Sequence, residues 1–326
     1  MILPYTVRLL CICFATFFLV HAALSLVIWA CSSAAIRFGE ALRPRLAARI
    51  LLFLRLSPFV LAIFVVTALC IPSYLWLEPD ATFEQVGILC VLAAILGMAI
   101  WIASIVRVAR AWSLSLRYRR QWECESNQTR IAGHDSAVFV TPGGAPLVAL
   151  AGIVRPRIIV SQRVLGALRP EELDAALRHE RAHDISHDNL KRLLVLLAPG
   201  VLPFVRGFAS LDRAWARFTE WAADDHATAG ESHRSLSLAA ALVHIAQMGA
   251  APGFSPLASS LFTSGTDLRE RVDRLLGVER TIPVTPRRTR IFFIGSVLVA
   301  AIFLAVALSR PETFYFVHGL LEQLIH

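Results

Sequence analysis

The stretch HERAH carries the residue types and the spacing of a metal-dependent hydrolase. His179 and His183 are four positions apart, and Glu180 directly follows the first histidine. Residues four apart lie on one face of a helix, so both imidazoles can bind one zinc ion while Glu180 stands beside it. A catalytic zinc ion has three protein ligands and keeps an open position for water, which Glu180 would deprotonate. An HExxH string occurs by chance in about one chain of this length in a hundred, so its context must add support.

The third zinc ligand must come from elsewhere in the chain. In the extended form of the motif a third histidine lies six positions after His183, but Asn189 stands there. The other common solution is a glutamate on a second helix. Glu220 and Asp224 lie one helical turn apart in EWAADD. We therefore expect Glu220 as the third ligand and Asp224 as a hydrogen-bond partner of a ligand histidine. The alternative is that these carboxylates belong to a solvated helix face.

Other polar residues near the motif are assigned supporting roles. Asp188 is expected to form hydrogen bonds within the site, whereas His187 is expected to be exposed or to cap a helix. Hydrolysis also needs a group that stabilises the oxyanion or contacts the substrate. Arg271 and His226 are the candidates, and the sequence does not decide between them.

Composition indicates that this site belongs to a membrane protein. The chain has 326 residues, of which 56% are hydrophobic and 17% charged, and its mean hydropathy is +0.61. These values differ from those of a typical soluble protein, and long apolar runs can cross a bilayer as helices. Transmembrane helices are predicted over about residues 9–31, 50–76, 85–107 and 291–309. Arg55 lies in the second, so its side chain must reach the membrane surface or face protein.

The charges beside these runs predict the orientation in the membrane. Arginines follow the first and third predicted helices and precede the fourth, whereas the loop between the second and third is acidic. Short cytoplasmic loops are enriched in Lys and Arg, so we expect both chain ends outside and the segment after the third helix inside. We therefore attribute the net charge of +8 to the arginines that set the orientation in the membrane, and we expect no nucleic-acid partner. The first run lacks a cleavage site and is expected to remain as an anchor.

The predicted helices divide the chain into three parts. Residues 1–121 are expected to form the membrane region with three helices, and residues 122–285 the cytoplasmic zinc peptidase domain. Residues 286–326 are expected to hold the fourth helix and a short outer tail. In the middle part, short strands broken at proline and glycine precede a helix that begins at Pro170. Further helices are expected over residues 212–229, 236–248 and 266–276. The predicted class is a mostly α membrane protein with an α+β peptidase domain.

Several stretches together resemble the zinc peptidases of the beta-lactam sensor-transducers, the BlaR/MecR type. They are HERAHDISHD, the upstream PLVALAGIVRPRIIVS and LRPEELDAALRHE, and the downstream EWAADD. The resemblance implies a gluzincin-like domain in which His179, His183 and Glu220 bind one Zn²⁺ ion. It also implies that Glu180 is the catalytic glutamate. The strand near Pro146–Ala151 would match an edge that holds the substrate in extended form.

The resemblance extends to the four-helix layout and to TDLRERVDRLLG, which is similar to an arginine-containing helix of these proteins and of HtpX-type and CAAX-prenyl protease-type peptidases. It implies a membrane-bound endopeptidase in regulatory proteolysis, acting on a protein or peptide such as a cytoplasmic transcriptional repressor. Sensor-transducers carry an extracellular penicillin-binding domain after the last helix. Only a short tail follows here, so we do not expect beta-lactam sensing by this chain alone. Two alternatives remain: an HtpX-like quality-control protease, and a non-catalytic signalling scaffold with a structural metal site.

Overall fold

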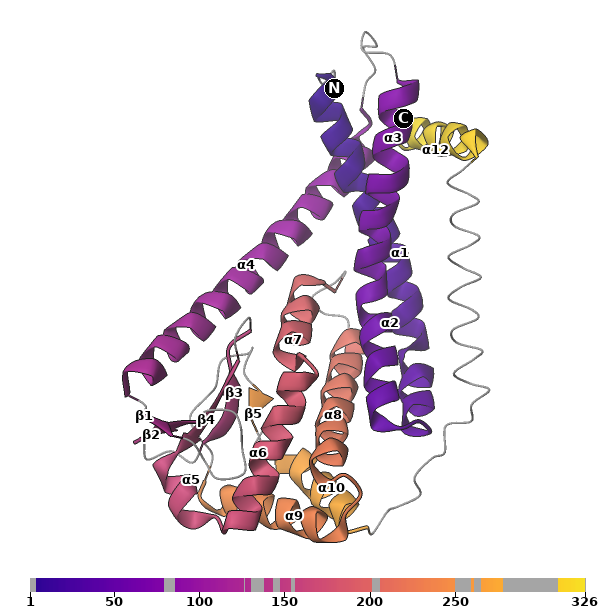
Figure 1. The fold of residues 1–326 in the computed structure, drawn as a ribbon. Coiled ribbons are helices and arrows are strands. Elements are labelled where there is room, and N and C mark those ends of the chain that lie inside the picture. Colours follow the sequence, from indigo (N-terminus) through magenta and orange to yellow (C-terminus); the bar gives the residue numbers. More distant parts are fainter. Residues whose placement is uncertain are drawn as a thin grey trace.

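The computed structural model describes residues 4–78, 86–125, 127–129, 138–142, 147–153, 156–200, 206–249, 259–260, 265–277 and 310–325. Over these residues the protein is mostly helical, with one small sheet. Long helices extend from one end of the molecule, and shorter helices gather with the sheet at the other end (Figure 1). The fold thus has a membrane-type part and a mixed α+β part.

Three helical segments are long and apolar enough to cross a membrane. They are α1 (Tyr5–Glu40), the continuous segment of α2 (Pro44–Val65), the π-helical η1 (Val66–Cys70) and α3 (Ile71–Leu77), and finally α4 (Ile88–Glu125). Large apolar side chains remain exposed along all three, as expected where lipid replaces water. The first three predicted segments are therefore confirmed as helices that are long and apolar enough to cross a membrane. The fourth, over residues 291–309, lies outside the described residues.

These helices extend further than the predicted apolar runs. The helix α1 continues through Arg37 to Glu40, and α4 continues through its cluster of arginines to Glu125. Apolar length limits the part of a helix that can lie in a bilayer, but it does not end the helix. Arginine, leucine and alanine are good helix formers, so the backbone hydrogen bonds continue into the charged flank.

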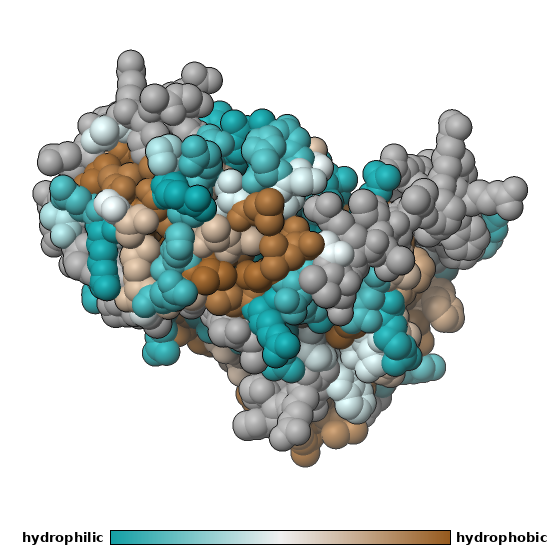
Figure 2. Space-filling view, turned by 90° about the horizontal axis from the view of Figure 1, so that it is seen from below, coloured by the Kyte–Doolittle hydropathy of each residue, from teal (hydrophilic) through white to brown (hydrophobic). Residues whose placement is uncertain are grey.

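The mixed part contains a five-stranded sheet. The strand order is β1-β2-β4-β3-β5; β2 and β4 are parallel, and all other neighbours are antiparallel. The strands are β1 (Asn127–Thr129), β2 (Val138–Thr141), β3 (Val148–Ala151), β4 (Arg157–Ser161) and β5 (Ser259–Ser260). Three of them, β2 to β4, lie where the sequence predicts short strands. Figure 2 views this end of the molecule from below, where hydrophilic residues surround a group of hydrophobic ones.

Helix α6 occupies the centre of the mixed part. The helices of this part are α5 (Gln162–Ala167), α6 (Pro170–Ile185), α7 (Asp188–Leu197), α8 (Arg206–Thr228), α9 (Ser232–Gln247) and α10 (Gly265–Leu275). Helix α6 contacts β3, α8 and α9. Its Leu177 packs with Leu150 of β3 and Leu242 of α9 in one buried core. This packing fixes the HExxH residues on a rigid element. Beyond the mixed part, α12 (Pro311–Ile325) lies beside α3 (Figure 1).

Arg55 of α2 faces protein. Its Nε donates a hydrogen bond to Asp212 Oδ1 of α8 at 2.8 Å, and its Nη2 donates to the carbonyl oxygen of Ala198 at 2.8 Å. Its guanidinium also lies over the ring of Phe208. An arginine inside an apolar helix is costly unless it is paired. The contacts of Arg55 therefore tie α8 to the second membrane-type helix.

Gly97 allows α4 to approach α1 closely. A Cβ atom at this position would overlap the carbonyl oxygen of Phe14. Gly97→Ala is therefore expected to push the two helices apart, at a cost of roughly 1–3 kcal/mol. The measurement is the midpoint of thermal unfolding in detergent. Gly166→Ala in α5 is the control, since a Cβ there meets nothing within 4 Å. Equal midpoints for the two variants would contradict the close contact.

Glu172 secures the first turn of α6. Its Oε2 accepts a hydrogen bond from the backbone N–H of Arg169 at 3.0 Å, and its Oε1 accepts one from Arg169 Nε at 2.8 Å. His244 Nδ1 of α9 lies 3.1 Å from Oε2. Burial raises the pKa of Glu172, but Arg169 and His244 outweigh it, and the pKa lies below its ordinary value. The carboxylate form therefore stabilises the helix start.

Glu172→Gln is expected to destabilise the protein by about 1–2 kcal/mol, because the charge-assisted hydrogen bonds of the carboxylate are lost. Glu171→Gln, at an exposed neighbour, is the matched control. A depressed folded-state pKa gives stability that is present above the ordinary glutamate pKa and is lost as the pH falls through the folded value. The gap between the unfolding midpoints of wild type and Glu172→Gln should therefore narrow on acidification. A gap that widens would contradict this role.

Candidate metal centre

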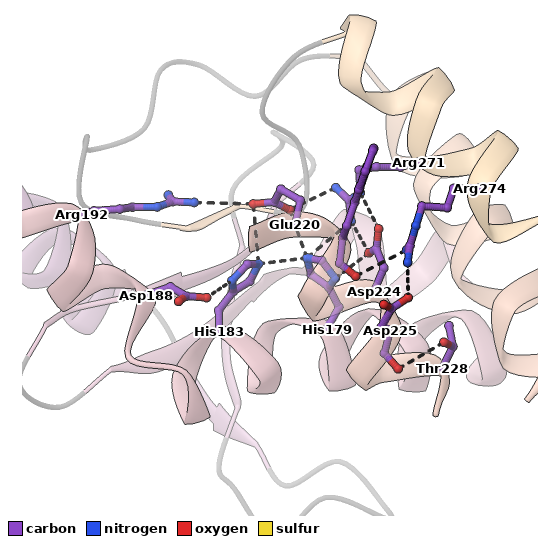
Figure 3. Close-up of polar contacts among 11 residues, drawn as sticks. His179, His183, Asp188, Arg192, Glu220, Asp224, Asp225, Thr228, Arg271 and Arg274 are labelled. Atoms are coloured by element: carbon purple, nitrogen blue, oxygen red, sulfur yellow. Dashed lines mark hydrogen bonds and ion pairs between the residues drawn. The ribbon is translucent and has the colours of Figure 1, made fainter. Parts of the chain in front are cut away.

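Helices α6 and α8 bring His179, His183 and Glu220 together in one buried cluster (Figure 3). One ligand atom of each lies within 4.8 Å of those of the other two. The Nε2 atoms of the two histidines are 3.1 Å apart. Glu220 Oε2 lies 3.4 Å from His179 Nε2, and Glu220 Oε1 lies 3.7 Å from His183 Nε2. This group could hold a metal ion.

The other ring nitrogen of each histidine faces a carboxylate. His183 Nδ1 lies 2.7 Å from Asp188 Oδ2, and His179 Nδ1 lies 2.9 Å from Asp224 Oδ1. When each Nδ1 carries the proton toward its carboxylate, both Nε2 atoms present lone pairs to each other and to Glu220. Converging lone pairs and a carboxylate repel one another unless a cation lies among them. Asp188 thus orients His183 through a hydrogen bond, and Asp224 lies within ion-pair distance of His179, where carboxylates stand beside metal-binding histidines.

Glu180 lies beside these ligands with its side chain fully buried. Neither of its carboxylate oxygens has a hydrogen-bond partner among the described residues. Burial raises the pKa of Glu180 to about 7, although His183 and His179 act to lower it. Buried polar atoms of folded proteins nearly always have a partner, so these oxygens indicate a site for water or a ligand. A carboxyl group with a pKa near neutrality can accept and return a proton.

The surrounding carboxylates favour positive charge on the two histidines. Burial lowers the pKa of His183, but Glu220 and Asp188 outweigh it and raise the pKa to about 10. The pKa of His179 is also raised, since Asp224 and Glu220 outweigh burial. Burial raises the pKa of Glu220, but the histidines hold it well below its ordinary range. The centre therefore attracts cations, and protons and a metal ion would compete for the same nitrogens.

Arg271 of α10 closes the cluster on the side of Asp224. Its guanidinium donates to Asp224 through Nε at 2.9 Å and through Nη2 at 2.6 Å, and its Nη1 lies 3.2 Å from Glu220 Oε2. Burial raises the pKa of Asp224, but Arg271 and His179 lower it to about 2. Arg271 therefore keeps Asp224 ionised and ties two acidic residues of α8 in place. Its expected oxyanion role remains a prediction.

The remaining predicted residues lie at different places relative to the cluster. His226 is exposed near the end of α8, and no described contact joins it to the metal-binding side chains. His187 precedes α7 and adopts a left-handed backbone conformation, with φ of 53°. The predicted substrate-binding edge lies partly within β3, but β3 pairs with β4 on one side and, through Ala149 and Leu150, with β5 on the other. The prediction of an open edge is therefore wrong for these two residues, because β5 occupies that side of the strand. The first residue of the predicted edge, Pro146, lies outside the described residues.

Two residues that sequence reasoning did not assign also support the centre. Arg192 Nη2 of α7 lies 3.5 Å from Glu220 Oε1. Asn189 Nδ2 donates to the carbonyl oxygens of Leu150 at 3.1 Å and Gly152 at 2.8 Å, which joins the start of α7 to β3. Asn189 directly follows Asp188, and this adjacency was the available signal. No sequence pattern linked Arg192 to Glu220.

Asp188→Asn is expected to weaken metal binding about 10–100-fold, because an amide no longer favours the proton on His183 Nδ1 that leaves Nε2 free for the metal. The measurement is zinc competition against a chromophoric chelator, with purified full-length protein. Asp184→Asn, one residue beyond His183 and with no described side-chain contact to the cluster, is the control. An unchanged affinity in folded Asp188→Asn would show that this contact does not position the ligand.

Comparison with known proteins does not place the chain in a family. No family model matches it, and a search of curated proteins gives no match.

Proposed function

We propose that the protein is a membrane-bound, zinc-dependent endopeptidase. One observation carries the proposal: two histidines of an HExxH helix and a glutamate from a second helix converge beside a buried glutamate whose oxygens have no described hydrogen-bond partner. Helix α6 supplies His179, Glu180 and His183, and α8 supplies Glu220. This combination is the one that metal-assisted hydrolysis needs.

The donor set and its spacing fit zinc. Two imidazoles and one carboxylate are a common ligand set of catalytic zinc sites, which keep a fourth position open. Ligand atoms about 2.0–2.2 Å from a tetrahedral ion lie roughly 3.3 Å apart. His179 Nε2 and His183 Nε2 are 3.1 Å apart, and each lies near a different oxygen of Glu220, at 3.4 Å from Oε2 and 3.7 Å from Oε1 respectively. With one ligand atom taken from each residue, all three lie within 4.8 Å of one another. One Zn²⁺ ion can be held once the Glu220 carboxylate shifts so that one of its oxygens approaches both imidazole nitrogens.

A zinc ion bound there would supply Lewis acidity, which polarises a peptide carbonyl and acidifies water. In the proposed mechanism Glu180 takes a proton from the attacking water as the new C–O bond forms. Glu180 then delivers that proton to the amine as the C–N bond breaks, so that one water molecule is consumed for each bond cleaved. Asp188 and Asp224 hold the imidazoles in place, and Arg271 holds Asp224.

The cellular role is proposed from the sequence motifs. The stretches that resemble BlaR/MecR-type peptidases support regulatory proteolysis by a cytoplasmic domain, with a protein or peptide as substrate. The arginine-rich flanks of α1 and α4 support a cytoplasmic position for residues 122–285. The three long apolar helices support a position in the cell membrane. A transcriptional repressor is the substrate class that the resemblance suggests.

Comparison of protein N-termini in cells that express wild type or Glu180→Gln tests this function. Wild type is expected to generate new N-termini in one or a few proteins, and Glu180→Gln should generate none of them. Asp184→Asn, which removes a carboxylate from the same helix outside the cluster, should behave like wild type. Identical sets of N-termini in wild type and Glu180→Gln would contradict the proposal.

A further inference from the structure

A pocket separate from the three metal-binding side chains lies between α2, the start of α7 and α8. Its volume is about 180 Å³. The charged groups that line it are Arg45 and Arg49 of α2 and Asp188 and Lys191 of α7. Trp215 of α8 and several small or apolar side chains complete the walls. The pocket thus lies where the membrane-type helices meet the domain that carries the metal centre.

Positive charge exceeds negative charge in this pocket, since three cationic side chains line it with one carboxylate. That carboxylate is already engaged: Asp188 Oδ2 lies 2.7 Å from His183 Nδ1, and Asp188 Oδ1 accepts from Lys191 Nζ at 2.7 Å. No carboxylate within the described ranges pairs with Arg45 or Arg49. These arginines are one turn apart on α2, where like charges repel. The pocket is therefore suited to an anion.

The start of α2 adds to this attraction. The helix begins at Pro44, which has no N–H, and the N–H groups of Leu46 and Ala47 already donate to the carbonyl oxygen of Arg43, so this helix start contributes through its dipole. A helix start carries partial positive charge and binds anions, above all phosphates. Arg45 lies in the first turn and Arg49 in the second, so the positive charges of both guanidinium groups add to the partial positive charge of the helix start. Arginine also matches the oxygens of a phosphate with paired N–H donors.

The position of the pocket along α2 indicates where the anion comes from. Arg45 and Arg49 precede the apolar part of α2, and Trp215 lines the same pocket. Arginine is enriched in the short segments that flank transmembrane helices on the cytoplasmic side, whereas Trp215 is buried against protein. Basic pockets beside transmembrane helices at the membrane surface bind the headgroups of anionic lipids. A headgroup phosphate can enter the pocket while its acyl chains remain in the bilayer.

We infer that this pocket binds the phosphate of an anionic membrane lipid through Arg45, Arg49 and Lys191. Lys191 also holds Asp188, and Asp188 holds His183, so the lipid site and the metal centre share one continuous set of contacts. The inference does not depend on peptidase activity, because it rests on the charge, the shape and the position of the pocket.

Native mass spectrometry of the full-length protein in neutral detergent tests the inference, with phosphatidylglycerol or phosphatidylcholine added in increasing amounts. Wild type is expected to retain phosphatidylglycerol in preference to phosphatidylcholine. The double variant Arg45→Gln/Arg49→Gln should bind phosphatidylglycerol about tenfold more weakly or worse, since two charge-assisted contacts are lost. Lys191→Gln, on the opposite wall of the pocket, should weaken binding in the same direction.

The control is Arg37→Gln/Arg43→Gln, which removes the same charge from exposed positions near the start of α2 but outside the pocket. It should retain wild-type binding. Equal losses in both double variants would mean that general surface charge attracts the lipid, and would overturn the inference. Inorganic phosphate is added in a separate arm. If it binds as tightly as phosphatidylglycerol and displaces it, the pocket serves a soluble phosphate and the assignment to lipid is wrong.

Discussion

Glu180→Gln is expected to keep its metal ion and to lose peptidase activity by about 10²- to 10⁴-fold, the range typical of a general base. Glutamine has nearly the same shape as glutamate, so the fold around His179 and His183 should remain. An amide cannot accept the proton of the attacking water. Zinc content and casein cleavage, measured on one purified sample, separate the loss of chemistry from the loss of metal.

Asp184→Asn is the matched control for this variant, because it removes a carboxylate from the same helix one residue after His183. Its cleavage rate and zinc content should equal those of wild type. Undiminished cleavage by Glu180→Gln would refute the role of Glu180. Loss of both zinc and activity would instead make Glu180 a residue that maintains the site, and the proposed proton transfer would need another group.

Glu220→Ala is expected to lower the affinity for zinc more than Asp188→Asn does, for which the expected loss is about 10–100-fold. The reason is that Glu220 is itself a proposed metal ligand, whereas Asp188 only positions the ligand His183. The substitution also removes one of the two carboxylates that pair with Arg271, and a carboxylate 3.5 Å from Arg192. Less negative charge would then balance the buried Arg271 and the partly buried Arg192, which further disfavours a metal cation beside the histidines. The measurement is the zinc content of purified protein after dialysis against a mild chelator.

Asp225→Asn serves as the control for this variant. Asp225 lies on the same helix but is exposed, and its Oδ1 pairs with Arg274 at 2.6 Å. Its zinc content should equal that of wild type. Full zinc content in folded Glu220→Ala would move the third ligand to Asp224. Asp224 would then have to exchange its contact with His179 Nδ1 for a bond to the metal.

The local part of the centre could be predicted from the sequence. A spacing of four residues places His179 and His183 on one face of any α-helix, whatever the rest of the fold does. Glu220 was predicted from a second pair of carboxylates at the same spacing, which indicates a helix face but not what that face contacts. The sequence therefore predicted the side chains that could meet, and the structure places them together.

Contacts that depend on chain reversals could not be predicted in the same way. The chain turns at His187 with a positive φ, a conformation for which histidine gives only a weak signal. That turn aims α7 so that Arg192 reaches Glu220 and Asn189 reaches β3. The pairing of β5 with β3 likewise involves Ser259 and Ser260, which have no strand-like pattern. Such contacts follow from tertiary packing.

Apolar runs predicted the presence of the long helices but not their full lengths or partners. Helices α1 and α4 continue into charged residues because nothing in those flanks breaks the backbone hydrogen bonds. The sequence left Arg55 between two possibilities, the membrane surface or protein. The hydrogen bond from Arg55 to Asp212 shows that the side chain faces protein. Asp212 is too distant in the chain for any local sequence pattern to indicate this contact.

The most direct test of the central claim is to measure zinc content and casein cleavage together in the purified full-length protein, before chelation, after chelation and after zinc is restored. We predict one zinc ion per chain, loss of cleavage when the ion is removed, and recovery of both when zinc returns. Cleavage that continues without metal would contradict a zinc endopeptidase, as would a folded protein that takes up no zinc.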